Sequence, residues 1–331
     1  MKHLYLLIIA FLCVNCSSDE KPIEIVLNDI EHGAVIRTLA VNYAEFHPGD
    51  LTSTFNVDIE EQDLEDGNLL EEVDVYIRFL DNTLTSGNAS TQEVLHKTFT
   101  KSDFTIGANG FPTTNLSISY QEAIDATGVA ESLIACKDQF LVRLDLKLTD
   151  GRSFSFGDSS SNIIAFDTFF SSPFCYTINV VEPIAEDVFT GVYDMESLVN
   201  SARLDVPVFT ELEEDFSAII ALFEIRKGHS TNTRVFDGFY ANGHRGGERF
   251  RTFEFTVACD EIIFQKNQFS SYRSACTSRD PIILLGPSET NGLANSSDDT
   301  VFTMHVLEGY LGFDGGCGFG SHEAIVKFSK Q

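Results

Sequence analysis

The sequence predicts an all-β protein with two antiparallel domains, each a β-sandwich of immunoglobulin-like architecture, or a sandwich followed by a small barrel. Three observations indicate this fold class. Short segments alternate apolar and polar residues, which is typical of half-buried strands. Clusters of Gly, Asn, Asp and Ser separate these segments. The chain has 331 residues and is 43% hydrophobic, which suffices for two hydrophobic cores.

The first half carries the clearest strand pattern. Every second residue from Phe140 to Leu148 is apolar, whereas Arg143, Asp145 and Lys147 face the other way. Asp150-Gly151 follows as a hairpin turn. The other elements expected in this half are strands over Val35–Val41, Thr54–Ile59, Val73–Leu80, Val94–Thr100, Asn115–Ser119, Ser153–Phe156 and Phe174–Val180, and a short helix over Tyr120–Ala126.

A linker is expected over residues 183–187, because Pro183 favours extended geometry before it and interrupts strand pairing. It separates a β-sandwich domain, 25–182, from a second antiparallel β domain, 188–331. The elements expected in the second domain are strands over Val188–Tyr193, Ile219–Arg226, Arg234–Tyr240, Phe250–Val257, Glu261–Gln265, Ile282–Leu285, Val301–Leu307 and Ala324–Phe328, and one helix within Leu198–Phe216.

The N-terminal residues predict export. Lys2 and His3 precede an apolar run from Leu4 to Leu12, which is shorter than the roughly 20 residues of a membrane-spanning helix. A run of this length after a basic start is typical of a secretory signal. Residues 1–15 are therefore expected to be a signal peptide.

Cys16 is the expected lipidation site. The preceding Leu12-Cys13-Val14-Asn15 resembles a bacterial lipobox, which implies that Cys16 is acylated. Residues 16–24 are then a lipidated tether. Its Ser17-Ser18-Asp19-Glu20 run is similar to the export signal of surface lipoproteins in Bacteroidetes, which implies an outer-membrane anchor and an extracellular orientation. Several acyl chains on one residue anchor a protein stably.

The net charge excludes one class of partner. At −28, the chain repels the phosphates of nucleic acids and anionic lipids, so no nucleic-acid partner is expected. The chain has no Trp but 29 Phe residues, which suit β cores. The absence of Trp also disfavours the stacking platforms of many carbohydrate-binding surfaces, although Tyr serves the same purpose.

Five of the seven cysteines remain once the leader Cys and the anchor Cys are set aside. Export makes disulfides possible. The candidate pairs are Cys136 with Cys175 and Cys259 with Cys276, which leaves Cys317 unpaired, but connectivity cannot be deduced from sequence. These five contain no Cys-x-x-Cys, which disfavours a zinc site.

Acidic residues are densest from Asp58 to Asp74, which holds nine of them and no Lys or Arg. Clustered oxygen ligands in a loop suit Ca²⁺. Asp81-Asn82 would lie nearby if the two flanking strands formed a hairpin. With Gly67 as the sixth position of an EF-hand loop, however, the first and third ligand positions hold Gln62 and Leu64. A solvated acidic loop is the simpler interpretation, and a Ca²⁺ site is the alternative.

No catalytic residue, cofactor site or metal ligand is predicted. The Gly-x-Ser-x-Gly and His-Glu-x-x-His motifs of hydrolases and the glycine-rich phosphate loops are absent from the sequence. Ser321, His322 and Glu323 are adjacent, but neighbours on a strand face opposite sides and do not predict a triad. His229 and His244 flank one expected strand as half of a metal site, and exposed loop histidines are the simpler interpretation.

The chain is similar to the surface lipoproteins of marine flavobacteria, of the SusE/SusF-like accessory type. The similarity lies in the lipobox, the Ser/acid run after Cys16, and the segments 60–67 (EEQDLEDG) and 73–83 (VDVYIRFLDNT). It covers the leader and most of residues 33–182. Such proteins accompany outer-membrane barrel transporters, so the resemblance implies a location and a role but no active site or ligand.

We therefore expect a non-catalytic surface lipoprotein that binds a ligand or a partner as an accessory of an outer-membrane uptake complex. The expected partner is a β-barrel transporter or another surface lipoprotein. One alternative is an extracellular polymer-degrading hydrolase, which needs two buried carboxylates facing each other in one cleft. The other is a Ca²⁺-dependent adhesion module, whose stability would rise with Ca²⁺. No other cofactor is expected.

Overall fold

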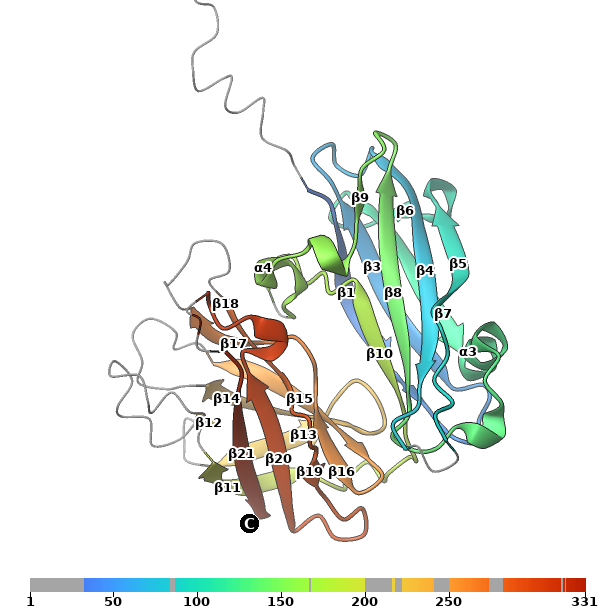
Figure 1. The fold of residues 1–331 in the computed structure, drawn as a ribbon. Helices are drawn as coiled ribbons and strands as arrows, with labels where there is room; N and C mark the ends of the chain where they lie inside the picture. The colour runs from blue at the N-terminus through green and yellow to red at the C-terminus, as the bar shows by residue number, and fades with distance from the viewer. Residues whose placement is uncertain are drawn as a thin grey trace, which may run out of the picture. The chain divides into compact units, whose positions relative to one another are not determined.

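The computed structural model describes residues 33–83, 87–166, 168–199, 216–217, 222–240, 250–273, 282–316, 318 and 320–331. Strands predominate among them, and the α-helices are two short ones, α3 (Tyr120–Thr127) and α4 (Ser161–Ile164). The predicted all-β fold class is confirmed (Figure 1). Short 3₁₀ turns are η1 (Lys101–Asp103), η2 (Glu131–Leu133), η3 (Phe156–Asp158) and η5 (Tyr310–Gly312). The lipidation site Cys16 lies outside the described residues.

Two sheets form from residues 35–180. The first has the strand order β1–β3–β7–β6, and the second has the order β2–β10–β8–β4–β5, with β9 paired to β8. Their bounds are β1 Val35–Tyr43, β2 Glu45–Phe46, β3 Thr54–Gln62, β4 Leu70–Leu80, β5 Val94–Thr100, β6 Thr105–Ile106, β7 Pro112–Ser119, β8 Gln139–Leu148, β9 Ser153–Phe154 and β10 Cys175–Val180. Neighbouring strands are antiparallel, apart from the parallel pair of β2 and β10.

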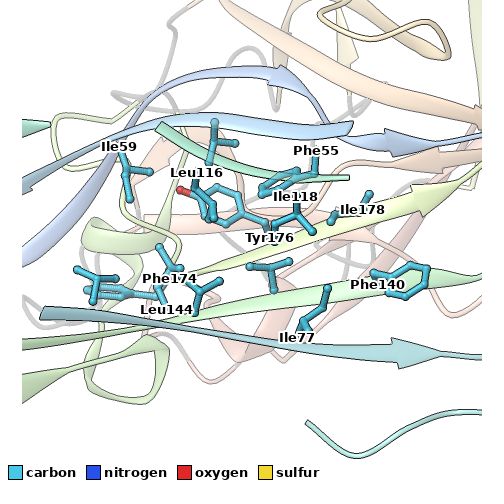
Figure 2. Packing of buried hydrophobic residues seen from close by; sticks show 14 of the residues in the cluster. Phe55, Ile59, Ile77, Leu116, Ile118, Phe140, Leu144, Phe174, Tyr176 and Ile178 are labelled. Carbon is cyan, nitrogen blue, oxygen red and sulfur yellow. The ribbon is translucent and has the colours of Figure 1, made fainter. Parts of the chain in front are cut away.

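A hydrophobic core lies between these two sheets, as in a sandwich (Figure 2). Phe55 and Ile118 come from the first sheet, and Phe140, Leu144 and Ile178 come from the second. All five are completely buried. The predicted alternation is confirmed along β8, whose residues alternate between buried and half-buried positions over the whole strand. Burial contributes roughly 1.5–3 kcal/mol for each large apolar side chain, so this core is the main support of the first half.

One large sheet of eleven described strands forms the second half. Its order is β17–β18–β20–β21–β11–β13–β14–β15–β16–β19, with β12 paired to β14. The bounds are β11 Gly191–Val199, β12 Phe216–Ser217, β13 Phe223–Lys227, β14 Thr233–Tyr240, β15 Arg251–Ala258, β16 Glu261–Phe264, β17 Gln268–Arg273, β18 Ile282–Pro287, β19 Gly292–Leu293, β20 Val301–Glu308 and β21 His322–Lys330.

The strand β11 lies inside this sheet, between β13 and β21, and pairs Tyr193 with Lys330. At its C-terminal end, Leu198 and Val199 belong to β11, and Val199 pairs with Ile325 of β21. A helix was predicted within Leu198–Phe216, and residues 200–215 of that range lie outside the described residues.

The sheet curls into a half-barrel until its β19 edge lies against β20. The backbone of Gly292 is so near Thr303 that an added Cβ would lie 2.0 Å from the Thr303 carbonyl oxygen. Inside the curl, the ring of Phe302 stacks on Phe328 with 4.9 Å between centroids. Phe255 reaches the same ring from β15 at 5.6 Å. Contacts between strands far apart in the sheet order therefore enclose a second core.

The disulfide differs from both candidate pairs. Cys136 and Cys259 are joined, with their Cα atoms 6.1 Å apart, and Cys175 is free. The fold brings the turn before β8 to the tip of the β15–β16 hairpin, whereas Cys175 begins β10 inside the sandwich. The pairs Cys136–Cys175 and Cys259–Cys276 are therefore wrong. Cys276 and Cys317 lie outside the described residues.

The acidic segment Asp58–Asp74 connects the two sheets of the sandwich and is not part of a hairpin. β3 belongs to the first sheet and β4 to the second, so Asp81-Asn82 follows β4 at the end remote from this connection. Within the connection, Asp63 accepts three backbone N–H bonds from the following turn, at 2.7, 2.9 and 2.8 Å. This carboxylate therefore shapes the turn, and the hairpin that would have brought Asp81-Asn82 near the acidic segment does not form.

Glu61 places a carboxyl group in the sandwich core. It follows Phe55, Val57 and Ile59 on the inward face of β3 and is completely buried. Neither carboxyl oxygen has a hydrogen-bond partner among the described residues. Burial, reinforced by the charge of Asp63, raises the pKa of Glu61 to about 8. The group is mostly protonated at neutral pH, because ionising it without a partner is costly.

Replacing this carboxyl with an amide, in Glu61→Gln, is expected to stabilise the protein above neutral pH. The pKa of about 8 in the folded state lies above the ordinary 4.5, so the folded state retains a proton that the unfolded state has lost. The wild-type free energy of unfolding should therefore fall as pH rises between these two values, by up to roughly 5 kcal/mol at about 1.4 kcal/mol per pKa unit. Denaturant unfolding at pH 5, 7 and 9 measures the change.

The matched control is Glu65→Gln, which removes an exposed charge from the same segment and should keep the wild-type pH dependence. A Glu61→Gln protein whose stability follows pH as steeply as the wild type would show that Glu61 is ionised in the fold.

Candidate functional site

A polar cleft of about 600 Å³ lies between loops of the sandwich and the curled sheet. Its lining is mostly polar. The amide side chains are Asn82, Gln139, Asn179, Gln265 and Asn291, the hydroxyl groups are Thr83, Thr177 and Ser288, and the charged side chains are Lys137, Glu261, Lys266 and Glu289. Ile263, Phe264 and Pro287 add apolar surface. The volume is typical of small-ligand sites, in which a few convergent polar groups fix the ligand.

The disulfide between Cys136 and Cys259 stands at one wall of this polar cleft. Beside it, Lys137 Nζ lies 2.6 Å from Glu261 Oε1, so an ion pair joins the same two segments. Lys137, Cys259 and Asp260 have left-handed backbones, with φ of 84°, 52° and 66°. Residues other than Gly adopt this conformation at a cost, which the surrounding structure must offset. The wall is therefore held firmly in one geometry.

Neighbouring side chains orient the amides of the polar cleft. Gln139 Nε2 donates to Asn179 Oδ1 at 2.9 Å, and Asn291 Nδ2 donates to Glu261 Oε2 at 2.9 Å. An amide offers two donor hydrogens and an oxygen acceptor, so each of these contacts uses part of its capacity. The cleft thus presents donors and acceptors at fixed positions, which suits a ligand rich in hydroxyl groups.

A second cleft, of about 520 Å³, shares Thr177, Gln265 and Lys266 with the polar cleft. It is lined by β1, by residues around β10 and by residues of β15 and β17. The buried Tyr176 hydroxyl is hydrogen-bonded to Thr38 Oγ1 at 2.8 Å. Cys175 lines this cleft as well, and burial raises the pKa of its thiol to about 11. A thiol that stays protonated at neutral pH is a poor nucleophile, so the site does not favour cysteine catalysis.

His229 in the second cleft forms an ion pair with Glu254, with 2.8 Å between Nδ1 and Oε2. Burial opposes protonation, but the hydrogen bond and charge of Glu254, aided by Glu45, outweigh it and raise the pKa of His229. His244, its proposed partner in a metal site, lies outside the described residues. Across the described ranges, no group of three or more His, Cys, Asp or Glu side chains is placed to hold a metal ion.

The adjacent Ser321, His322 and Glu323 are not brought together into a triad. The Ser321 hydroxyl donates to a backbone carbonyl at 2.7 Å. Glu323 accepts a hydrogen bond from Ser288 and lies 3.2 Å from His305 Nδ1. Here the carboxylate lies between the hydroxyl and the imidazole, whereas a triad needs the imidazole between the other two groups.

Sequence analysis did not identify the lining of the polar cleft. The lining residues are far apart in the sequence, and only the fold brings them together: Thr177 lies in β10, Glu261 begins β16, and Asn82, Lys137 and Asn291 lie outside strands. The sequence did offer one indication of the site: Cys136 and Cys259, which form the disulfide, both lie outside the expected strands. A disulfide between two turns fixes the positions of the residues around it.

Replacing both members of the disulfide, in a Cys136→Ser, Cys259→Ser double variant, is expected to lower the free energy of unfolding by roughly 2–5 kcal/mol, because a long loop is no longer closed in the unfolded chain. The loop spans 123 positions. Denaturant unfolding with and without dithiothreitol measures the loss. Reduced wild type should match the double variant, and Cys175→Ser should keep the wild-type response to reductant. If dithiothreitol left the free energy of unfolding of the wild type unchanged, the Cys136–Cys259 disulfide would be contradicted.

Comparisons with known proteins give no family. No family model matches the chain. No curated protein matches it either. Among solved structures, it is similar to Spo0M, a sporulation control protein from Bacillus subtilis, with 12% identity, a TM-score of 0.23, and coverage of 71% of this chain and 80% of that one. Within the described residues, no helix is both long and apolar enough to cross a membrane.

Proposed function

We propose that this chain is a non-catalytic surface lipoprotein that binds a polar, hydroxyl-rich ligand, an oligosaccharide, as an accessory of an outer-membrane uptake complex. One observation supports ligand binding above the others. The polar cleft gathers five amide side chains and several hydroxyl and charged groups around about 600 Å³. The second cleft has only three amide side chains in its lining, Gln265, Asn267 and Gln268.

The chemistry of the lining matches an oligosaccharide. Neighbouring hydroxyl groups on a sugar both donate and accept hydrogen bonds, as do the amides of Gln139, Asn179 and Asn291. Ile263 and Pro287 offer apolar surface to the C–H face of a sugar ring. The chain has no Trp to stack on that face, so hydrogen bonds must supply most of the affinity.

The rigid wall of the polar cleft supports a preformed binding site, in contrast to a site that closes around its ligand. The Cys136–Cys259 disulfide and the ion pair of Lys137 with Glu261 link the two segments of the wall before any ligand arrives. Preorganised groups lose less conformational freedom when they bind. Affinity should therefore depend on the fixed positions of the lining groups.

The hydrolase alternative has less support. It requires two carboxyl groups at a fixed separation across the substrate. Glu261 and Glu289 both line the polar cleft, but Glu289 is exposed and Glu261 is ion-paired with Lys137. Neither carboxyl group is buried opposite the other in the way that the hydrolase alternative requires. A binding role needs no such pair of carboxyl groups.

The Ca²⁺-dependent adhesion alternative also has less support. Three acids of the segment Asp58–Asp74 already have cationic partners: Glu60 lies 2.7 Å from Arg37, and Glu72 and Asp74 lie 2.7 and 2.8 Å from Lys147. Glu60 and Asp74 are buried. Ca²⁺ would have to compete with these ion pairs.

An oligosaccharide-binding screen with the mature, tagged protein tests the ligand. Asn291→Ala is expected to weaken the binding of any oligosaccharide found by roughly 5- to 10-fold, because one hydrogen bond contributes about 1 kcal/mol. Isothermal titration calorimetry measures the change. Asn115→Ala, which removes an exposed amide from the outer face of the sandwich, should bind as the wild type does. Equal binding by wild type and Asn291→Ala would place the ligand elsewhere.

Cys16→Ser tests the anchor and the partner. Acylation of Cys16 predicts that the wild type partitions with outer membranes, whereas the variant is recovered in the aqueous fraction. A pull-down from native outer membranes in mild detergent, followed by mass spectrometry, identifies companions. A stoichiometric barrel transporter is the expected companion. Recovery of the tagged protein alone would contradict the accessory role, and a membrane-bound Cys16→Ser protein would contradict lipidation.

A further inference from the structure

Lys266 lies in the wall shared by the polar cleft and the second cleft. It stands in the turn between β16 and β17 and lines both clefts. Its ammonium group donates a hydrogen bond to Thr177 Oγ1 at 2.9 Å. Burial lowers the pKa of Lys266, and the positive charge of Arg78 adds to this effect. The position is therefore an unfavourable one for a cation.

No carboxylate among the described residues forms an ion pair with Lys266. The acids that line the two clefts have other partners or face solvent: Glu261 pairs with Lys137 at 2.6 Å, Glu254 pairs with His229 at 2.8 Å, and Glu289 is exposed. Acids outnumber Lys and Arg by 50 to 22 in this chain of net charge −28. Despite this surplus of acids, Lys266 has no carboxylate counter-ion among the described residues.

Desolvating a charge without an opposite charge is unfavourable, and such groups are concentrated where a ligand completes the pair. The hydroxyl of Thr177 satisfies only one of the three N–H donors of Lys266. An anionic oxygen in either cleft would accept from the others and gain a charge-assisted hydrogen bond.

We propose that Lys266 is the anchoring cation for an acidic group of the ligand, so that the cleft selects acidic oligosaccharides over neutral ones. This inference rests on the proposed binding of an oligosaccharide and narrows its chemical class. The shared chemistry is a monoanionic oxygen group on a sugar, which occurs as the carboxylate of a uronic acid or as a sulfate ester.

The test compares three oligosaccharides of equal length by isothermal titration calorimetry: an oligogalacturonide, a sulfated galacto-oligosaccharide and the neutral galacto-oligosaccharide. Wild type should bind at least one acidic oligosaccharide about tenfold more tightly than the neutral one. Lys266→Met should abolish this preference, and Lys266→Arg should restore part of it. The two acidic compounds distinguish carboxylate from sulfate recognition.

Two controls separate charge from folding. Lys327→Met also removes one positive charge, from an ion pair with Glu196 on the curled sheet, and should keep the preference. The thermal unfolding midpoint of Lys266→Met should equal or exceed that of wild type, because the variant removes a half-buried cation that has no carboxylate partner among the described residues. Free glucuronate and inorganic sulfate, titrated with each variant, report on the anion site without an oligosaccharide.

The possible outcomes distinguish the selection of acidic ligands by Lys266 from the proposed binding of oligosaccharides. Loss of the acidic preference in Lys266→Met, but not in Lys327→Met, supports the inference. Equal binding of acidic and neutral oligosaccharides by wild type overturns it and leaves the proposed function intact. Lys266-dependent binding of glucuronate or sulfate, without any oligosaccharide, supports the anion site and overturns the proposed function. Absence of binding by all five probes overturns both.

Discussion

The Cys136–Cys259 disulfide joins the turn before β8 to the tip of the β15–β16 hairpin, and the polar cleft depends on this join. A buried network lies near it in the fold. The Asn232 side chain donates to the carbonyls of Glu182 and Val257 at 2.7 Å each, and its backbone N–H donates to Glu45 at 2.9 Å. Buried polar groups that are fully paired specify one arrangement, because every alternative leaves some of them unpaired. The covalent bond and this network together fix which residues face the cleft.

Glu61 and Lys266 both lack an ion-pair partner among the described residues, but their surroundings differ. Glu61 is completely buried and neither of its carboxyl oxygens has a hydrogen-bond partner there, so protonation avoids an unpaired charge. Lys266 borders two clefts, where an anion can approach it. An unpaired buried charge indicates a binding site only when solvent-accessible space adjoins it. Of these two groups, only Lys266 meets that condition.

The fold class and most strands could be predicted from the sequence, because alternation reports directly on which face of a strand is buried. β5 has the predicted bounds, and β8 begins one residue before them. The strand β17 was missed because the segment Gln268–Arg273 shows no clear apolar alternation. The buried position of Glu61 could have been predicted, since it continues the inward series of Phe55, Val57 and Ile59.

The cleft could not be predicted in the same way. Its lining residues come from several strands and turns that are far apart in the sequence, and their meeting depends on how two β structures join. The disulfide was misassigned for the same reason, since Cys136 and Cys259 are far apart in sequence and close only in the fold. In the sequence, Lys266 has no feature that distinguishes it from other turn lysines. Its lack of an ion pair becomes evident only from the structure, in which Glu261 and Glu254 of the two clefts are paired with other residues.

The place of β11 in the curled sheet has a consequence for the order in which the chain folds. β11 pairs with β21, for example Met195 with Phe328. The first strand of the second half therefore lacks this pairing partner until the last strand has been made. Until β21 has been synthesised, one edge of β11 stays open and the apolar side chains that β21 covers remain in contact with water. Open strand edges invite pairing with other chains, and long-range pairing is slow. The second half therefore cannot complete its sheet, or the core that β21 covers, before its last strand is available.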